Sequence, residues 1–112
     1  MRKVLGKISS IDLSCKDGKL GLFIYFDLDG GKSGIADHTN FIWSFSSVTP
    51  DSHHKWTEED RMSQAADIMK KIDKLLSEAK KEDLQQLRNI PVEVTIKDSN
   101  CFDSFRILKE VL

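Results

Sequence analysis

The sequence predicts an α+β domain: an antiparallel sheet of about five strands in the order β-β-β-α-α-β-β, with one long amphipathic helix packed on one face. Two observations predict this class. Apolar residues recur at every second position in residues 20–28, as in a core-facing strand. They recur at spacings of three and four in residues 62–79, as along one face of a helix. The length, 112 residues, fits a single domain, 1–112, because two smaller domains would each bury too little core.

The first segment is predicted to be a strand with a kink. Side chains alternate faces along a strand, so a change of parity in the apolar positions requires a β-bulge. Ser9–Ser10 marks that change. The apolar positions are Val4, Gly6 and Ile8 before it, and Ile11, Leu13 and Cys15 after it. Residues 16–19, with Asp-Gly at their centre, predict a tight hairpin turn.

The second strand has the clearest alternation in the chain. Its predicted core face is formed by Leu20, Leu22, Ile24, Phe26 and Leu28. Phe23 and Tyr25 lie on the opposite face. Aromatic residues there indicate that this second face is partly covered as well, as in a central strand.

A third strand is predicted broadly over residues 33–45, after a turn at residues 29–34. Three aromatic residues are in step along it: Phe41, Trp43 and Phe45. Its polar middle, residues 37–40, is expected to be bulged or looped. A polar loop over residues 46–55 then leads to the helix.

The helix is predicted over residues 57–79. Thr57 is its expected N-cap, since its hydroxyl accepts the backbone N–H three residues on and Asp60 reaches back. The apolar stripe consists of Met62, Ala65, Ala66, Met69, Ile72, Leu76 and Ala79. We expect this stripe to pack on the core face of the second strand.

A hairpin is predicted to close the domain. A short helical turn around residues 83–88 precedes Pro91, which disfavours helix in the residue before it. Val92, Val94 and Ile96 then alternate with polar residues, and residues 98–100 form a turn. The last strand is predicted over residues 102–111, with its inward positions at Phe105, Ile107 and Val111.

Composition restricts the function classes. With 17 basic and 18 acidic side chains the net charge is −1, which argues against a strong polyanion binder but leaves a local basic patch possible. No apolar run reaches 18 residues and the start has no signal-peptide core, so we expect no membrane association and a cytoplasmic location. Cys15 and Cys101 are expected to be reduced, partly buried thiols, with pairing or metal ligation as the alternatives.

No motif predicts catalysis, so we expect no enzyme, no catalytic residues, no cofactor and no metal. Gly31-Lys32-Ser33 lacks the first glycine of a phosphate loop and is followed by a strand. Adjacent His53 and His54 cannot easily face one metal ion. All three histidines, His38, His53 and His54, are expected to be solvated loop residues. The chain contains no G-x-S-x-G turn for a nucleophile.

The remaining candidates are aromatic and basic side chains near the start of the helix. The candidate binding residues are Trp43, Trp56, Arg61, His53, His54 and Phe41. One interpretation is core packing, with Trp56 as a hydrophobic staple over the first helical turn. The other is an aromatic binding surface anchored by Trp and Arg. If the ligand of this surface is a nucleic acid, its bases stack on Trp43 or Trp56 and the basic first hairpin takes part in binding. Its basic residues are Arg2, Lys3, Lys7, Lys16 and Lys19.

Over nearly its full length the chain resembles a loose set of small proteins encoded by bacteriophages and prophages. The resemblance is carried by four segments: Gly6–Ile11, the pair Asp60-Arg61, Leu87–Val94 and Phe105–Leu108. The Gly-rich middle segment of that set is replaced here by the polar and aromatic run of residues 37–45.

The resemblance implies a protein that acts by binding, in the cytoplasm of a bacterial host cell. The first hypothesis is a stoichiometric, anti-CRISPR-like inhibitor of a host antiviral defence system, whose partner is a defence protein or complex or its signalling nucleotide. The alternative is a phage DNA-metabolism accessory protein that binds nucleic acid. A small hydrolase is a third hypothesis, and a homo-oligomer is compatible with each.

Overall fold

The protein is seen in a computed structural model, which describes residues 1–31 and 35–112. Its elements are β1 (Arg2–Lys16), β2 (Lys19–Leu28), β3 (Ala36–Trp43), α1 (Glu58–Ala79), a 3-10 helix (Leu84–Leu87), β4 (Pro91–Ile96), β5 (Phe102–Ile107) and a second 3-10 helix (Lys109–Val111). Five antiparallel strands and one long helix confirm the predicted α+β class and its chain order. The predicted start of the third strand at Ser33 and part of the turn at residues 29–34 lie outside the described residues.

The strand order in space is β3-β2-β1-β4-β5, which differs from the order along the chain. Residues 2–7 of β1 pair with β4, and residues 6–16 pair with β2, so the long first strand lies at the centre. The ladder between β1 and β2 shifts register between Ile8 and Ser10, which confirms the bulge predicted at Ser9–Ser10. A β-bulge increases the local twist of a strand, so β1 can pair with β4 along its first part and with β2 along the rest.

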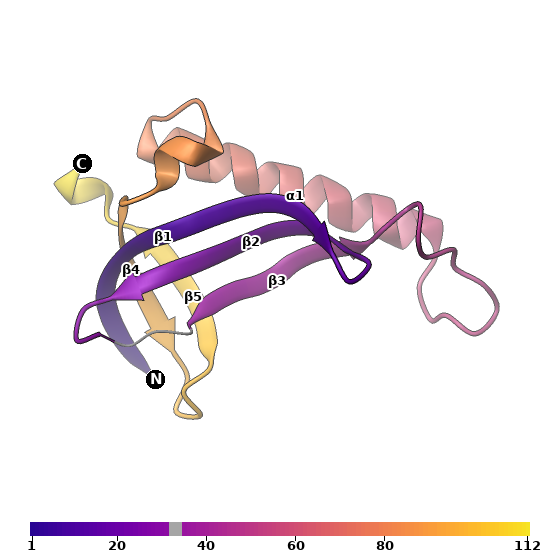
Figure 1. The fold of residues 1–112 in the computed structure, drawn as a ribbon, viewed down its shortest axis with the longest axis horizontal. Coiled ribbons are helices and arrows are strands. Elements are labelled where there is room, and N and C mark those ends of the chain that lie inside the picture. The colour runs from indigo at the N-terminus through magenta and orange to yellow at the C-terminus, as the bar shows by residue number, and fades with distance from the viewer. Residues whose placement is uncertain (32–34) are drawn as a thin grey trace.

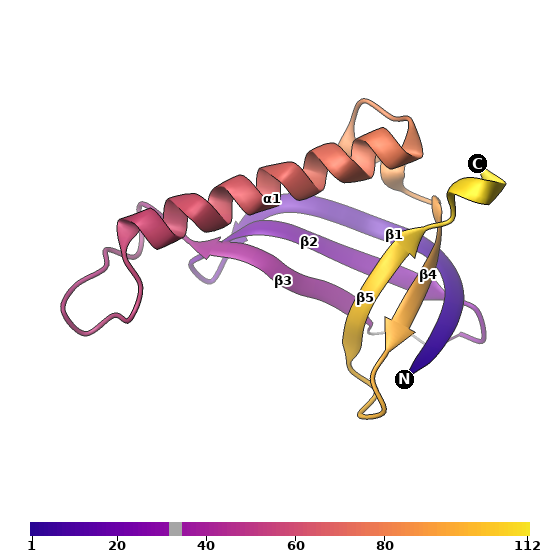
Figure 2. The same cartoon turned by 180° about the vertical axis from the view of Figure 1, so that it is seen from behind.

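The sheet is curled rather than flat. In Figure 1 the strands curve so that the edge strands β3 and β5 approach each other, and the two make contact. Within the described part of the chain no ladder joins these two edges. Helix α1 lies along this open side and contacts both β3 and β5 (Figure 2). The molecule is therefore a partly open barrel with α1 along its opening.

The core lies inside the curl of the sheet, beneath α1. Its buried members are Ile8, Ile11, Leu22, Ile24, Phe26, Leu28, Leu75, Ala79, Leu87, Ile90, Val92, Val94, Ile96 and Ile107. The predicted inward residues of the second and fourth strands are confirmed except for Leu20, which is half-buried and lies outside the core. The turn between β1 and β2 is also as predicted, because Asp17 and Gly18 both have positive φ, as a two-residue hairpin of type I′ requires.

Helix α1 begins and ends close to the prediction, but its packed face is different. Thr57 caps it through a complete capping box with Asp60, as predicted. Met62 and Met69, predicted to be buried, are 57% and 62% exposed, and Ala66 is exposed too. The residues that pack on the core are Ile68, Ile72, Leu75, Leu76 and Ala79. Arg61, not Met62, takes the inward position at the start of the helix, which turns the packed stripe by about one residue.

Two strand ends also differ from the prediction. β3 ends at Trp43, so Phe45 lies in the loop beyond it. β5 ends at Ile107, and Val111, predicted to face inward, is 64% exposed. The chain leaves the sheet after Ile107 because the residues that follow close a 3-10 turn, in which the Val111 N–H donates to the Leu108 carbonyl.

Candidate binding surface

The ladders place a group of aromatic residues on the outer side of β2 and β3, away from the core. Residues directly opposite each other in an antiparallel pair share a face. Phe41 lies opposite Gly21 and Trp43 opposite Lys19, on the face that Phe23 and Tyr25 share. We call the following set the aromatic surface: Lys16, Lys19, Phe23, Tyr25, His38, Phe41 and Trp43.

The rings of the aromatic surface form two groups. The ring of His38 meets the rings of Phe23 and Tyr25 edge-on, with centroid distances of 5.7 and 5.2 Å. The rings of Phe41 and Trp43 meet edge-on at 5.7 Å. Edge-to-face pairs of this kind hold each other in orientation. Phe23 is 5% exposed and forms the floor, while Trp43 is 37% exposed.

Two lysines lie over these rings. The Lys16 ammonium is 5.3 Å from the centroid of Phe23 and 5.6 Å from that of Tyr25. The Lys19 ammonium is 5.2 Å from the centroid of Phe41. Ammonium groups are attracted to the faces of aromatic rings, but both lysines are exposed and keep their long, mobile stems. The aromatic surface thus combines flat apolar faces with positive charge.

Gly21 allows β3 to lie close to β2 beneath this surface. A Cβ at Gly21 would lie 2.1 Å from the Asn40 carbonyl oxygen and 2.5 Å from the Cα of Phe41. Both distances are too short for any side chain. Because glycine has no side chain, the backbone of β3 at Phe41 can lie this close to β2.

Arg61 does not belong to an exposed anchor, contrary to the prediction. It is 2% exposed, and its Nη1 donates to the carbonyl oxygens of Trp43, Ser44 and Val48 at 2.8, 2.9 and 2.8 Å. Its guanidinium also pairs with Glu58. A buried guanidinium must have its donors satisfied, and backbone carbonyls satisfy it here. Arg61 therefore holds the loop that follows β3.

Of the other predicted site residues, Trp56 packs against Arg61. The guanidinium carbon of Arg61 lies 4.6 Å from the ring centroid of Phe45 and 5.0 Å from that of Trp56. Trp56 thus packs over the first helical turn, as the staple interpretation predicted, and also meets the ring of His54 at 5.3 Å. His53 and His54 are exposed, in a turn organised by Asp51.

The predicted site residues therefore divide between two places. Phe41 and Trp43 belong to the aromatic surface, whereas Trp56 packs against Arg61 and His54 packs against Trp56. His53 lies in the exposed turn at Asp51. The Trp43 carbonyl, bound by Arg61, connects the two. Sequence reasoning did not assign Phe23, Tyr25 or His38 to a site. Their shared parity with Lys19 was a usable signal for the first two, but the irregular middle of β3 hid the position of His38.

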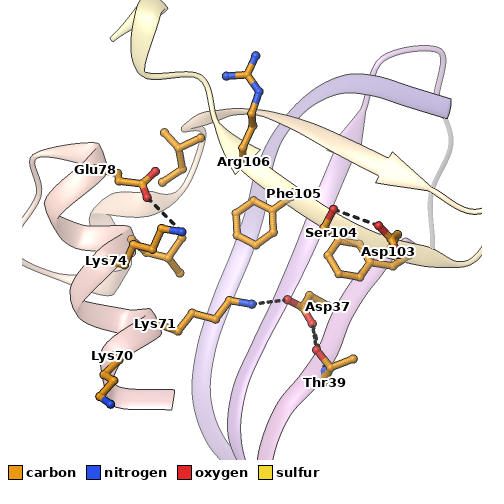
Figure 3. A pocket seen from close by; sticks show the side chains of 13 residues that line it. Asp37, Thr39, Lys70, Lys71, Lys74, Glu78, Asp103, Ser104, Phe105 and Arg106 are labelled. Carbon is orange, nitrogen blue, oxygen red and sulfur yellow. Dashed lines mark hydrogen bonds and ion pairs between the residues drawn. The ribbon is translucent and has the colours of Figure 1, made fainter. Parts of the chain in front are cut away.

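A pocket of about 440 Å³ lies on the open side of the barrel, between α1 and β5. Figure 3 shows Lys71 of α1 reaching across to Asp37 of β3, a pair whose N–O distance is 3.1 Å. The pocket is lined by charges of both signs: Asp37, Glu78 and Asp103 with Lys70, Lys71, Lys74 and Arg106. This mixture selects neither an anion nor a cation, so the pocket does not carry the functional argument.

The Asp37 carboxylate is satisfied by a local network. It is 1% exposed and accepts hydrogen bonds from the Thr39 hydroxyl and backbone N–H, from the Asn40 amide and from Lys71. Burial by itself raises the pKa of Asp37, but the hydrogen bonds from Thr39 and Asn40 and the charge of Lys71 outweigh it. The net effect is a pKa below the ordinary value of 3.8.

The cysteines are not partly buried as predicted, since Cys15 and Cys101 are both exposed and free. In residues 1–31 and 35–112, no three or more His, Cys, Asp or Glu side chains gather closely enough to hold a metal ion. Across the same residues, no helix has the length and apolar character needed to span a membrane.

Comparison with known proteins adds no relative. The chain matches no protein-family model, no curated sequence and no solved structure. The resemblance to bacteriophage proteins and the partners that it implies therefore stay predictions.

Proposed function

We propose that this protein binds single-stranded nucleic acid through the aromatic surface. The observation that carries the proposal is the position of Phe23, Tyr25, Phe41 and Trp43 on the outer side of β2 and β3. The inner side of these strands already packs the core. An antiparallel sheet needs only one apolar face to fold, so aromatic residues on its second face call for another explanation.

The chemistry of the aromatic surface suits a single strand. Unpaired bases stack on aromatic rings regardless of their sequence, and lysines beside the rings neutralise phosphates. Lys16 and Lys19 already lie within 6 Å of the ring centroids of Phe23, Tyr25 and Phe41, so an ammonium is close to three of the four rings. In a duplex the bases face each other and their planes are covered, so stacking of this kind requires unpaired bases.

The architecture supports the same proposal. A five-stranded, partly open barrel with a helix between its third and fourth strands resembles the OB fold, whose second and third strands commonly bind oligonucleotides. Such a likeness of architecture is an analogy, and one fold serves many functions. The proposal therefore rests on the aromatic surface itself.

The structure changes the binding surface on which the inhibitor hypothesis was based. Its predicted anchor was an exposed tryptophan, Trp43 or Trp56, beside Arg61, and Arg61 is buried. The aromatic surface also has the chemistry to bind a host defence protein, since tryptophan and tyrosine anchor protein interfaces. The experiment below separates this hypothesis from nucleic-acid binding.

The test measures binding of a labelled single strand of about 12 bases, a length within the site sizes of small barrels. We expect Trp43→Leu to lower the affinity about 5- to 100-fold, because one stacked base loses its platform. Met69→Ala is the matched control, since Met69 is exposed and apolar but lies on α1. A duplex of the same length should bind more weakly.

Three results would overturn the proposal. They are no binding of single strands at low salt, equal or tighter binding of the duplex, and equal losses in Trp43→Leu and Met69→Ala. In each case the aromatic surface would have to bind something else, and capture of a host protein that Trp43→Leu abolishes would favour the inhibitor hypothesis.

A further inference from the structure

We infer that the binding site continues beyond the end of β3 onto Phe45, whose ring is a further platform for a base, with Arg61 as its positioning residue. This inference rests on the proposed function and extends it to residues outside the aromatic surface. Phe45 was expected to be one more residue of the third strand, and the structure places it in the loop instead.

The Phe45 ring is half exposed and yet held in place. It is 48% exposed, and the Arg61 guanidinium carbon lies 4.6 Å from its centroid. A guanidinium stacks against one face of a ring, so the solvent-exposed part of Phe45 is left to a ligand. A base on the ring face opposite Arg61 would complete a stack of base, phenyl ring and guanidinium.

Arg61 also fixes the backbone on both sides of Phe45. One of its nitrogens, Nη1, donates to the carbonyls of Trp43 and Ser44 just before Phe45, and to that of Val48 shortly after it. Arg61 is buried, so these bonds are shielded from water. A ring that is already ordered loses less conformational entropy when a ligand binds than a ring on a mobile loop.

Phe45 is close enough to the aromatic surface to serve the same strand. It follows Trp43 by two residues, so their Cα atoms lie at most about 7 Å apart. The Trp43 carbonyl and the Phe45 ring contact the same guanidinium. A nucleic acid with one base on Trp43 can therefore place a neighbouring base on Phe45.

A purely structural role for Phe45 makes a different prediction. If the ring only shields Arg61, an apolar side chain of similar size replaces it without effect on binding. If the ring stacks a base, its flat face is required. Phe45→Leu and Phe45→Trp distinguish the two roles, because leucine keeps apolar contact without a ring and tryptophan enlarges the ring.

The experiment compares these variants in the same single-strand assay. We expect Phe45→Leu to lower the affinity about 5- to 100-fold, and Phe45→Trp to keep or raise it. Met62→Leu is the control, because Met62 is exposed beside Arg61 at the same end of α1. Thermal denaturation of each variant checks that the fold is retained.

Arg61 needs a readout that a merely structural role would not move. Arg61→Lys keeps the charge but loses the planar guanidinium, whose Nη1 donates to three carbonyls while Nε and Nη2 pair with Glu58. We expect this change to lower the affinity in the wild-type background and to have much less effect in the Phe45→Leu background, since the two residues act through one ring. Equal effects in both backgrounds would contradict a positioning role.

Photo-crosslinking keeps the inference testable if a variant fails to fold. A strand carrying a photoreactive thymine analogue is irradiated with the wild-type protein, and the attached residue is located by mass spectrometry. We expect crosslinks at both Trp43 and Phe45. Crosslinks at Trp43 without any at Phe45, or unchanged affinity in Phe45→Leu, overturn the extension alone. If Trp43→Leu binds the single strand as tightly as wild type, the proposed function is overturned as well.

Discussion

At the scale of the residue, two charged side chains are buried among the residues that the structure describes, and their hydrogen-bond partners are of different kinds. Arg61 is satisfied by three backbone carbonyls of one loop. Asp37 is satisfied by neighbours in its own bulged strand and by Lys71, 34 residues away. The loop carbonyls around Arg61 and the Lys71 partner of Asp37 could not be predicted from sequence, because they come from elements distant in the chain.

The Asp37 network predicts a pH dependence of stability. Its pKa is lower in the folded protein than in the unfolded chain, so ionised Asp37 stabilises the fold fully above the ordinary pKa of 3.8. This contribution is lost as the pH falls below 3.8 and through the folded pKa. We expect Asp37→Asn to be less stable than wild type at pH 7 by about 1–3 kcal/mol. Urea denaturation at pH 7 and pH 3 measures the difference.

The comparison of the two proteins isolates Asp37 from the other carboxylates. The gap in free energy of unfolding between wild type and Asp37→Asn should narrow at pH 3. A gap of the same size at both pH values would show that the carboxylate charge contributes nothing.

At the scale of the element, local signals predicted where α1 begins and ends but not which side it buries. Capping depends on residues within one turn, and Thr57 and Asp60 confirm it. Two apolar stripes overlap on this helix, and they share Ile72, Leu76 and Ala79. The stripe containing Ile68 and Leu75 packs inward because Arg61, one position before Met62, is drawn into the loop beyond β3.

This difference predicts the effect of two substitutions on the helix. Leu75 is 6% exposed and lies in the core, so Leu75→Ala should lower the free energy of unfolding by about 2–5 kcal/mol. Met69 is 62% exposed, so Met69→Ala should change it by less than about 0.5 kcal/mol. Denaturant unfolding of both variants checks which face of α1 is buried. A larger loss of stability in Met69→Ala than in Leu75→Ala would mean that the stripe predicted from the sequence is the buried one.

At the scale of the whole molecule, the charge is nearly balanced and the positive groups that matter are local. With a net charge of −1 the protein has no long-range attraction for a polyanion. Affinity for a single strand must therefore come from stacking on the aromatic surface and from the few phosphates that Lys16 and Lys19 reach.

The salt dependence of binding follows from this small number of contacts. Two phosphate contacts give a slope of about −1.4 in a plot of log affinity against log salt, since each contributes about −0.7 for a single strand. Changing Lys16 and Lys19 to Gln should bring the slope close to zero, whereas Lys80→Gln and Lys81→Gln, just beyond the C-terminal end of α1, should leave it unchanged. A steep slope that survives loss of Lys16 and Lys19 would place the phosphate contacts elsewhere.

The sequence by itself determined the elements of this protein and the tertiary structure decided the site. Parity, turns and caps are local, so the bulge at Ser9–Ser10, the hairpin at Asp17-Gly18 and the helix after Thr57 were all predictable. The aromatic surface was not, because it forms only when β3 pairs with β2 in a register that depends on an irregularity in the ladder and on close approach at Gly21. The burial of Arg61 likewise required the loop beyond β3 to fold back over the first turn of α1, a long-range contact that no local pattern encodes.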